Sequence, residues 1–289
     1  MLRHHFNIIT AILFLLFSSF LATAQLVEEP KDTPAEWSKP YPPFRIAGNL
    51  YYVGTDDLAC YLIVTPKGNI LINTGLASSL PLIKANVETL GFKFNDIKIL
   101  LTTQAHYDHM GAMSAIKKAT GAKLMVNKKD AAVAADGGSS DYALGGHGAT
   151  FEPIKTDRLL HNGDVIKLGD MQLVMLHHPG HTKGSSSFLF DVKDGDRKYK
   201  VLIANMPTIV TEKKFSEVLT YPDIAKDYAY TIAAMKKLTF DIWLSSHSSQ
   251  FGLHSKNKPG SVYNPTAFMD RIGYDEAIRD LEIQFFKKD

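Results

Sequence analysis

Cysteine is nearly absent from this sequence, whose 289 residues include only Cys60. An intramolecular disulfide is therefore excluded, and the fold must be stabilised by its hydrophobic core. Cys60 lies in the apolar run Ala59-Cys60-Tyr61-Leu62-Ile63-Val64, where a free thiol usually acts as a small hydrophobic side chain. We therefore expect Cys60 to be buried and to have no metal-binding or catalytic role.

An excess of charge of one sign is also absent. The formal net charge is only +2, and acidic and basic residues are interspersed along the chain. A chain with this even distribution of charge is not expected to form the basic surface that nucleic-acid-binding proteins present, so no nucleic-acid partner is expected. With 45% hydrophobic residues, the chain can bury the core of one large domain or two small ones.

Long apolar runs are confined to the N-terminus. Residues 8–21 are largely apolar, follow the basic Arg3, and precede Ala22-Thr23-Ala24, which has the small residues of a cleavage site. We predict a signal peptide at residues 1–24, cut before Gln25, and a periplasmic mature protein without a membrane anchor. The alternative is an uncleaved anchor, but the run is shorter than the ~20 residues that a spanning helix needs.

The rest of the chain is expected to form an arm and one domain. Residues 25–43 are rich in proline and charge, which predicts an extended arm packed on the body through Trp37 and Tyr41. Residues 44–289 contain no repeat and no linker. The glycine-rich residues 136–148 are expected to be either a mobile functional loop or disordered.

Strand-like runs in the domain occur in two blocks, each followed by helical patterns. Strands are expected at residues 44–53, 58–65, 69–73, 97–102 and 123–126, and again at 158–160, 165–168, 171–176, 187–191, 199–203 and 241–246. Helices are expected at residues 80–90, 110–119, 128–135, 223–238 and 265–286. These blocks predict an α+β fold with two sheets packed face to face and helices outside.

Metal-binding residue types cluster between the strand expected at 97–102 and the helix that follows. The segment is Gln104-Ala105-His106-Tyr107-Asp108-His109. Polar side chains where a strand ends converge on open space instead of packing into the core. Because zinc accepts imidazole and carboxylate ligands, His106, Asp108 and His109 predict a metal site.

Two later histidines occupy matching positions. His181 follows the strand expected at 171–176, and His247 follows the strand expected at 241–246. Since all these candidates follow strand ends, one edge of the two-sheet fold can gather them although they are far apart in the chain.

These motifs resemble those of the metallo-β-lactamase superfamily. The sequences QAHYDH, HPGHTKGSSSF and SSHSS are similar to the family's H-x-H-x-D-H motif and its two later, isolated histidines. More narrowly, the chain resembles the third subclass of class B β-lactamases, and the GOB-type members in which glutamine replaces the first histidine. The resemblance implies a four-layer αβ/βα sandwich with its metals at one edge.

The resemblance also implies two sets of zinc ligands. One zinc would be bound by Gln104, His106 and His181, and the other by Asp108, His109 and His247. An amide oxygen is a poorer donor to zinc than an imidazole nitrogen. We therefore expect one or two zinc ions, with the Asp108 site the stronger.

The activity implied is zinc-dependent hydrolysis of the amide bond of penicillins, cephalosporins and also carbapenems, which confers antibiotic resistance. Hydroxide generated at the metal would attack the lactam carbonyl, with Asp108 as the catalytic residue that orients it. The alternatives are another exported hydrolase of the superfamily, such as a lactonase or thioesterase, and a non-catalytic zinc-binding protein. Lactonases and thioesterases usually carry a metal-bridging aspartate where this chain has Met206, which disfavours the former.

Residues near these motifs are candidates for lesser roles. Contacts with the small-molecule substrate are expected from His147, Lys183, Ser185, Ser186 and Met206. Asn73 is expected either to support the metal site through hydrogen bonds or to be a plain turn residue. No catalytic serine is needed if water attacks directly. Nothing in the sequence indicates an oligomer, so a monomer is expected.

Overall fold

The computed structural model describes residues 26–288, so the expected signal peptide lies outside the described residues. The first sheet has seven strands in the order β1-β2-β3-β4-β5-β6-β7. Strands β1 to β4 form an antiparallel meander, whereas β4 to β7 run parallel to one another. Their bounds are Phe44–Ala47, Leu50–Tyr52, Tyr61–Thr65, Gly68–Ile72, Ile97–Leu101, Lys123–Asn127 and Arg158–Leu160.

The second sheet has five strands in the order β12-β11-β10-β9-β8. In chain order, β8 to β12 span Val165–Leu168, Met171–His177, Ser186–Asp194, Arg197–Ala204 and Ile242–Ser245. Neighbouring strands are antiparallel except β11 and β12, which are parallel. The chain between these two strands includes helix α5 (Ile224–Met235) and returns to the end of the sheet at which β11 begins.

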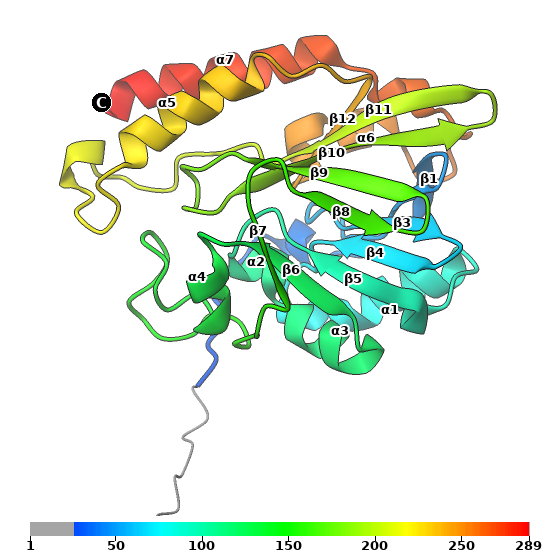
Figure 1. The fold of residues 1–289 in the computed structure, drawn as a ribbon, viewed down its shortest axis with the longest axis horizontal. Helices are drawn as coiled ribbons and strands as arrows, with labels where there is room; N and C mark the ends of the chain where they lie inside the picture. The colour runs from blue at the N-terminus through cyan, green and yellow to red at the C-terminus, as the bar shows by residue number, and fades with distance from the viewer. Residues whose placement is uncertain (1–25, 289) are drawn as a thin grey trace, which may run out of the picture.

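Helices cover the outer face of each sheet (Figure 1). The first sheet is covered by α1 (Leu80–Thr89) and α3 (Met113–Thr120), and the second by α5 (Ile224–Met235) and α7 (Arg271–Lys288). The shorter helices are α2 (Tyr107–Met110), α4 (Ala131–Ala135), α6 (Leu253–Lys256) and the 3-10 turns η1 (Ala35–Trp37), η2 (Ala77–Ser79), η3 (Phe94–Asp96), η4 (Phe215–Glu217), η5 (Ser249–Phe251) and η6 (Pro265–Phe268). The four layers expected from the sequence are confirmed.

The core lies between the two sheets and beneath the helices. Ile70 of the first sheet and Val201 of the second belong to one buried cluster, which fills the space between the sheets. A second cluster, which includes Val87 and Ile116, packs α1 and α3 onto the first sheet. Cys60 belongs to this second cluster and is 1% exposed, as expected. Burial raises the pKa of its thiol.

The helix expected at residues 110–119 was wrongly placed. Helix α2 already begins at Tyr107, so Asp108 and His109 lie on a helical turn, and α3 begins only at Met113. The interruption falls at Gly111, where a Cβ atom would lie 2.4 Å from backbone atoms of the preceding η2 segment. The absence of a side chain therefore lets the helix that carries the motif pack closely on that segment.

The helix expected at residues 265–286 is also divided. It forms the 3-10 turn η6 and then α7, which begins at Arg271. The carboxylate of Asp270 accepts a hydrogen bond from the backbone N–H of Gly273 at 2.9 Å, which caps the start of α7. Across residues 26–288, no helix combines the length and the hydrophobicity needed to cross a bilayer.

Candidate metal centre

Three separate parts of the chain carry the candidate ligands. Gln104 and His106 follow β5, and Asp108 and His109 lie on α2. The two later histidines follow the C-terminal ends of β9 and β12, respectively. The structure brings all of these segments together around one site.

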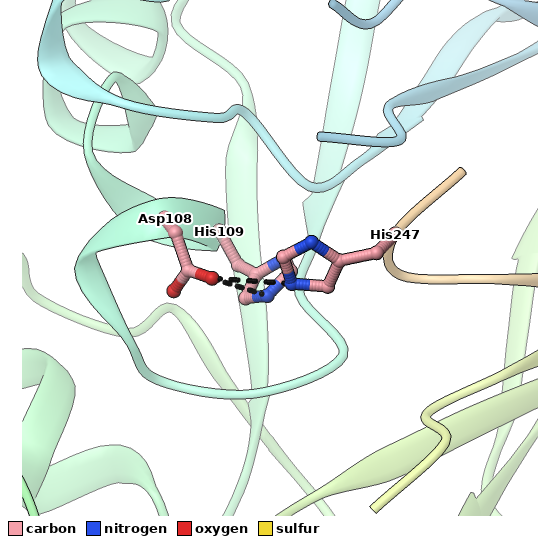
Figure 2. Close-up of side chains that lie close together, drawn as sticks. All are labelled: Asp108, His109 and His247. Atoms are coloured by element: carbon pink, nitrogen blue, oxygen red, sulfur yellow. Dashed lines mark ion pairs between the residues drawn. The ribbon is translucent and has the colours of Figure 1, made fainter. Parts of the chain in front are cut away.

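Asp108, His109 and His247 form the tightest group (Figure 2). Asp108 Oδ2 lies 3.1 Å from His109 Nε2 and 3.3 Å from His247 Nε2. One ligand atom from each of the three residues lies within 4.8 Å of the other two. One carboxylate and two imidazoles at these distances form a donor set that suits zinc.

His106 and His181 form a second group beside the first. The distance between His106 Nδ1 and His181 Nε2 is 3.2 Å. Two ring nitrogens at this distance can share either a proton or a cation. Gln104 lines the same cavity as these two histidines.

The partners of the ring nitrogens of His181, His247 and His109 show whether the candidate ligands fit a metal. His181 Nδ1 lies 2.7 Å from the carbonyl oxygen of Thr208, and His247 Nδ1 lies 2.9 Å from Asp57 Oδ2. The Nε2 atom of each ring is therefore the one directed toward the other candidate ligands. Both ring nitrogens of His109 are buried; Nδ1 has no hydrogen-bond partner within residues 26–288, and Nε2 faces the Asp108 carboxylate at 3.1 Å. Because buried polar atoms are normally paired, the donor set fits a bound cation.

The charges at the site agree with this fit. Burial opposes ionisation of Asp108, but His109 and His247 outweigh it and lower the pKa of the carboxyl well below its usual value. Burial lowers the pKa of His181 to about 3, so its imidazole is neutral, as a metal ligand must be. Burial likewise disfavours charge on His247, but its contacts with Asp108 and Asp57 raise the pKa to about 9. Metal binding by His247 is therefore coupled to proton release.

All the candidate ligands except His109 line a cavity of about 460 Å³. Trp37 from the N-terminal arm, Leu144 from the glycine-rich segment and Val210 from the chain after β11 add apolar surface to its wall. A cavity of this size and mixed lining suits a small organic molecule. Two larger cavities, which share Val64 and Pro66 in their linings, contain none of the candidate ligands.

Hydrogen bonds to Thr103 hold the segment that precedes Gln104. Asn73 adopts a φ of 62° and accepts a hydrogen bond from the backbone N–H of Thr103 at 2.9 Å. The amide of Asn205 donates to the carbonyl oxygen of Thr103 at 2.8 Å, and Ser246 donates to its hydroxyl at 2.9 Å. Asn73 is therefore hydrogen-bonded to the segment that leads into the motif.

Asp130 joins two of the segments that carry candidate ligands. Its buried carboxylate accepts hydrogen bonds from Ala105 N at 3.0 Å, Thr182 Oγ1 at 2.7 Å and Gly184 N at 2.6 Å. Burial raises the pKa of this carboxyl to about 6, although the hydrogen bonds from Thr182 and Ala105 oppose the rise. Asp130 thereby links the segment after β5 to the segment after β9.

The residues expected to contact substrate are not in the cavity wall. The lining includes none of His147, Lys183, Ser185, Ser186 and Met206. Lys183 instead donates to the carbonyl oxygen of Thr220 at 2.9 Å, and the hydroxyl of Ser185 lies 2.9 Å from that of Thr182 inside the protein. His147 is exposed, and Met206 is buried.

The residues at the site that were not identified from the sequence as members of it include Trp37, Asp57, Asp130 and Asp141. Asp57 lies in the turn between β2 and β3, and a single aspartate in a turn gives no sign of the histidine that it meets. Asp141 Oδ2 lies 3.4 Å from His106 Nε2, which brings the glycine-rich segment to the centre. No local pattern distinguishes this aspartate from others in polar loops.

Comparisons with known proteins identify the family to which this geometry belongs. Residues 54–194 match the model of the metallo-beta-lactamase superfamily. The crystal structure of the class B3 di-zinc metallo-beta-lactamase LRA-12, from an Alaskan soil metagenome, has a TM-score of 0.90 and 69% sequence identity to this chain, and the match covers 91% of this chain and 99% of that one. The chain belongs to the class B3 metallo-β-lactamases. The predicted resemblance to this subclass is confirmed.

Two further relatives of this class B3 metallo-β-lactamase differ in how much of the chain they match. The metallo-beta-lactamase GOB-18 of Elizabethkingia meningoseptica has a TM-score of 0.91 and 59% identity, over 92% of this chain and 98% of that one. The acyl-coenzyme A thioesterase MBLAC2 of Gallus gallus is 30% identical over 115 residues, or 38% of this chain. The match spans only 38% of the length of that curated relative, so it supports the superfamily and not a shared substrate.

Proposed function

We propose that this class B3 metallo-β-lactamase is a zinc-dependent hydrolase of the β-lactam amide bond. The observation that carries the proposal is the convergence of Asp108, His109 and His247 at one place, where Asp108 and His247 line a cavity and His109 is buried behind them. The 69% identity to a di-zinc metallo-beta-lactamase supports both the metal and the substrate class. Penicillins, cephalosporins and carbapenems are the proposed substrates, and antibiotic resistance is the consequence.

The residues divide into two zinc-binding groups that the protein holds in fixed orientations. One group is Asp108, His109 and His247, and the other is Gln104, His106 and His181. When bound, zinc lowers the pKa of a coordinated water to roughly 7 and polarises a carbonyl oxygen, so no separate strong base is needed. Asp57 and the Thr208 carbonyl orient one histidine in each group.

Asp108 is the proposed catalytic residue. It is ionised, because its pKa lies well below the usual value, and its Oδ2 atom faces the two histidines of its group. A buried carboxylate in this place can accept a hydrogen bond from the attacking water and so direct its lone pair at the lactam carbonyl. The apolar surfaces of Trp37, Leu144 and Val210 hold the substrate and exclude other water.

A chromogenic cephalosporin tests the proposal directly. Purified protein with zinc is expected to hydrolyse it, to lose the activity in a chelator, and to regain it when zinc is restored. The same sample is assayed with an acyl thioester and a lactone, the substrates of the alternative superfamily hydrolases. Turnover of either compound without turnover of the cephalosporin rejects the proposal, and zinc-loaded protein that hydrolyses none of them is a non-catalytic zinc-binding protein.

Because one group contains Gln104 in place of a histidine, we predict that the two groups differ in their affinity for zinc. A neutral amide oxygen binds zinc more weakly than an imidazole nitrogen, so we expect the Asp108 group to bind about tenfold more tightly or better. Calorimetric titration of metal-free protein with zinc measures both equivalents. Gln104→His is the matched variant and is expected to strengthen the second equivalent alone. Two equally tight equivalents in the unmodified protein would refute the prediction.

We also propose that residues 1–24 are a signal peptide and that the mature protein, residues 25–289, is a periplasmic monomer made of the arm at 25–43 and the domain at 44–289. Fractionation of expressing cells, followed by N-terminal sequencing, is expected to find a periplasmic chain that begins at Gln25. A cytoplasmic chain that retains Met1 is incompatible with this assignment. Size-exclusion chromatography with light scattering tests the monomer.

A further inference from the structure

The N-terminal arm, described from residue 26 to residue 43, reaches the metal centre through Trp37. The indole Nε1 of Trp37 donates a hydrogen bond to Asp57 Oδ2 at 3.1 Å. The centroid of its ring also lies 5.5 Å from that of His247. Trp37 therefore contacts both a candidate zinc ligand and the carboxylate that is paired with that ligand.

Asp57 accepts hydrogen bonds from two parts of the chain, the N-terminal arm and the segment after β12. His247 Nδ1 must be the donor in its 2.9 Å contact with Asp57 Oδ2, because an ionised carboxylate can only accept. The backbone N–H of Ser249 donates to Asp57 Oδ1 at 2.9 Å. Since Trp37 and His247 share Oδ2, the indole N–H helps to fix the direction in which this oxygen meets the imidazole.

Backbone hydrogen bonds keep Trp37 in register with Asp57. The N–H of Asp57 donates to the carbonyl oxygen of Glu36 at 3.2 Å, and the N–H of Asp56 donates to that of Lys39 at 2.9 Å. These two bonds lie on either side of Trp37 in the arm. The indole is therefore held against Asp57 by the chain itself and not only by its own side-chain contacts.

We propose that Trp37 is a positioning residue of the zinc centre, which acts on His247 through Asp57. A carboxylate bonded to the far nitrogen of a metal-binding histidine fixes the orientation of the ring and raises its basicity. The arm then helps to orient a ligand of the zinc centre, although it contributes no ligand itself. This inference rests on the proposed function, because it takes His247 to be a zinc ligand.

Cobalt(II) binding to the mature full-length protein tests the inference without an activity assay. Absorption of bound cobalt reports the geometry of the site, and competition with a chelator gives its affinity. Asp57→Asn is expected to weaken cobalt binding at the Asp108 group by about 10- to 100-fold. Trp37→Phe keeps an aromatic ring but loses the N–H donor, and is expected to weaken it by about 3- to 10-fold.

A double variant distinguishes action through Asp57 from an independent effect. In the Asp57→Asn background, Trp37→Phe is expected to cause little further loss, because the interaction that it removes is already broken. Unchanged affinity and absorption in Trp37→Phe, or losses that simply multiply in the double variant, would overturn the inference. Unmodified protein that binds no cobalt would overturn the proposed function and this inference with it.

Tyr41→Phe is the matched control for the docking of the arm. It removes the hydrogen bond from the Tyr41 hydroxyl to the carbonyl oxygen of Asn257 and leaves Asp57 untouched. Its cobalt affinity and absorption are expected to equal those of the unmodified protein. Equal losses in Tyr41→Phe and Trp37→Phe would mean that general docking of the arm, and not the indole N–H, sets the affinity, which also overturns the inference. Urea unfolding of each variant identifies any that fails to fold.

Discussion

Replacing Asp108 with asparagine is expected to lower kcat/KM for a cephalosporin by about 10³-fold, as measured by steady-state kinetics with saturating zinc. Asp108 supplies the one carboxylate of the group that it forms with His109 and His247, and its Oδ2 atom faces both rings. Stabilisation of charge at a metal site contributes several kcal/mol to the transition state, and each 1.36 kcal/mol or so is tenfold in rate. Asparagine keeps the shape of the side chain but removes the charge.

Asp194→Asn is the matched control for this change. Asp194 forms an ion pair with Arg45 at 2.7 Å, on a part of the surface that lies outside the cavity lining. The same substitution there should alter kcat/KM by no more than about twofold, because surface ion pairs contribute little. Metal analysis and urea unfolding of Asp108→Asn show whether the variant is folded and loaded. A loaded variant that retained more than about a tenth of the activity would exclude Asp108 as the catalytic residue.

The fold was predictable because its layers follow from local hydrophobic patterns. Apart from the exposed Lys98, residues 97–101 are apolar and buried, as in a parallel strand covered on both sides, and they form β5 between β4 and β6 of the first sheet. The ends of two helices were predicted wrongly, because tertiary contacts decide where these helices end or begin. Gly111 interrupts a helix because the chain packs against it, and Asp270 starts one by capping it. Neither contact can be recognised from the hydrophobic periodicity of the sequence.

The candidate zinc ligands were predictable for a different reason. Their residue types are unusual at strand ends, and strand ends can be located from the sequence. Their supporting residues could not be found in this way. Asp57 lies 190 positions from His247, and a single aspartate in a turn carries no sign of the ring that it will meet. Only the folded chain brings them within hydrogen-bonding distance.

Nearness in sequence to a candidate ligand does not by itself bring a residue into the cavity lining. Ser186 begins β10, where it pairs with His177 of β9, so its direction is set by the register of the sheet. Ser185 is turned into the protein by its contact with Thr182. The cavity is completed by Leu144 and Trp37, which come from a glycine-rich segment and from the arm. These segments have no regular pattern from which the direction of a side chain can be inferred.

Replacing Asp130 with alanine is expected to lower the free energy of unfolding by about 4 kcal/mol. The change removes the acceptor of two backbone N–H groups and one hydroxyl, at a position that is 1% exposed. Each buried donor left unpaired costs about 1–3 kcal/mol, and relief of the buried carboxylate offsets part of the sum. Urea unfolding with an unchanged m-value measures the loss.

The same substitution is expected to act unequally on the two zinc-binding groups. Asp130 joins the segment of Gln104 and His106 to the segment after β9, so its loss should weaken the second zinc equivalent by about 10- to 100-fold. None of these three hydrogen bonds involves α2 or the segment after β12, which carry the Asp108 group. The first equivalent should therefore retain its affinity in a calorimetric titration.

Two variants separate the loss of these hydrogen bonds from the loss of an aspartate. Asp275→Ala breaks an exposed ion pair with Arg271 on α7 and should cost less than about 1 kcal/mol. Asp130→Asn keeps one acceptor oxygen for Ala105 and Thr182 but turns an amide N–H₂ toward the N–H of Gly184, so its stability should lie between those of Asp130→Ala and the unmodified protein. If Asp130→Ala unfolded at the urea midpoint of the unmodified protein, or weakened both zinc equivalents alike, then Asp130 would not be the link that sets the second group in place.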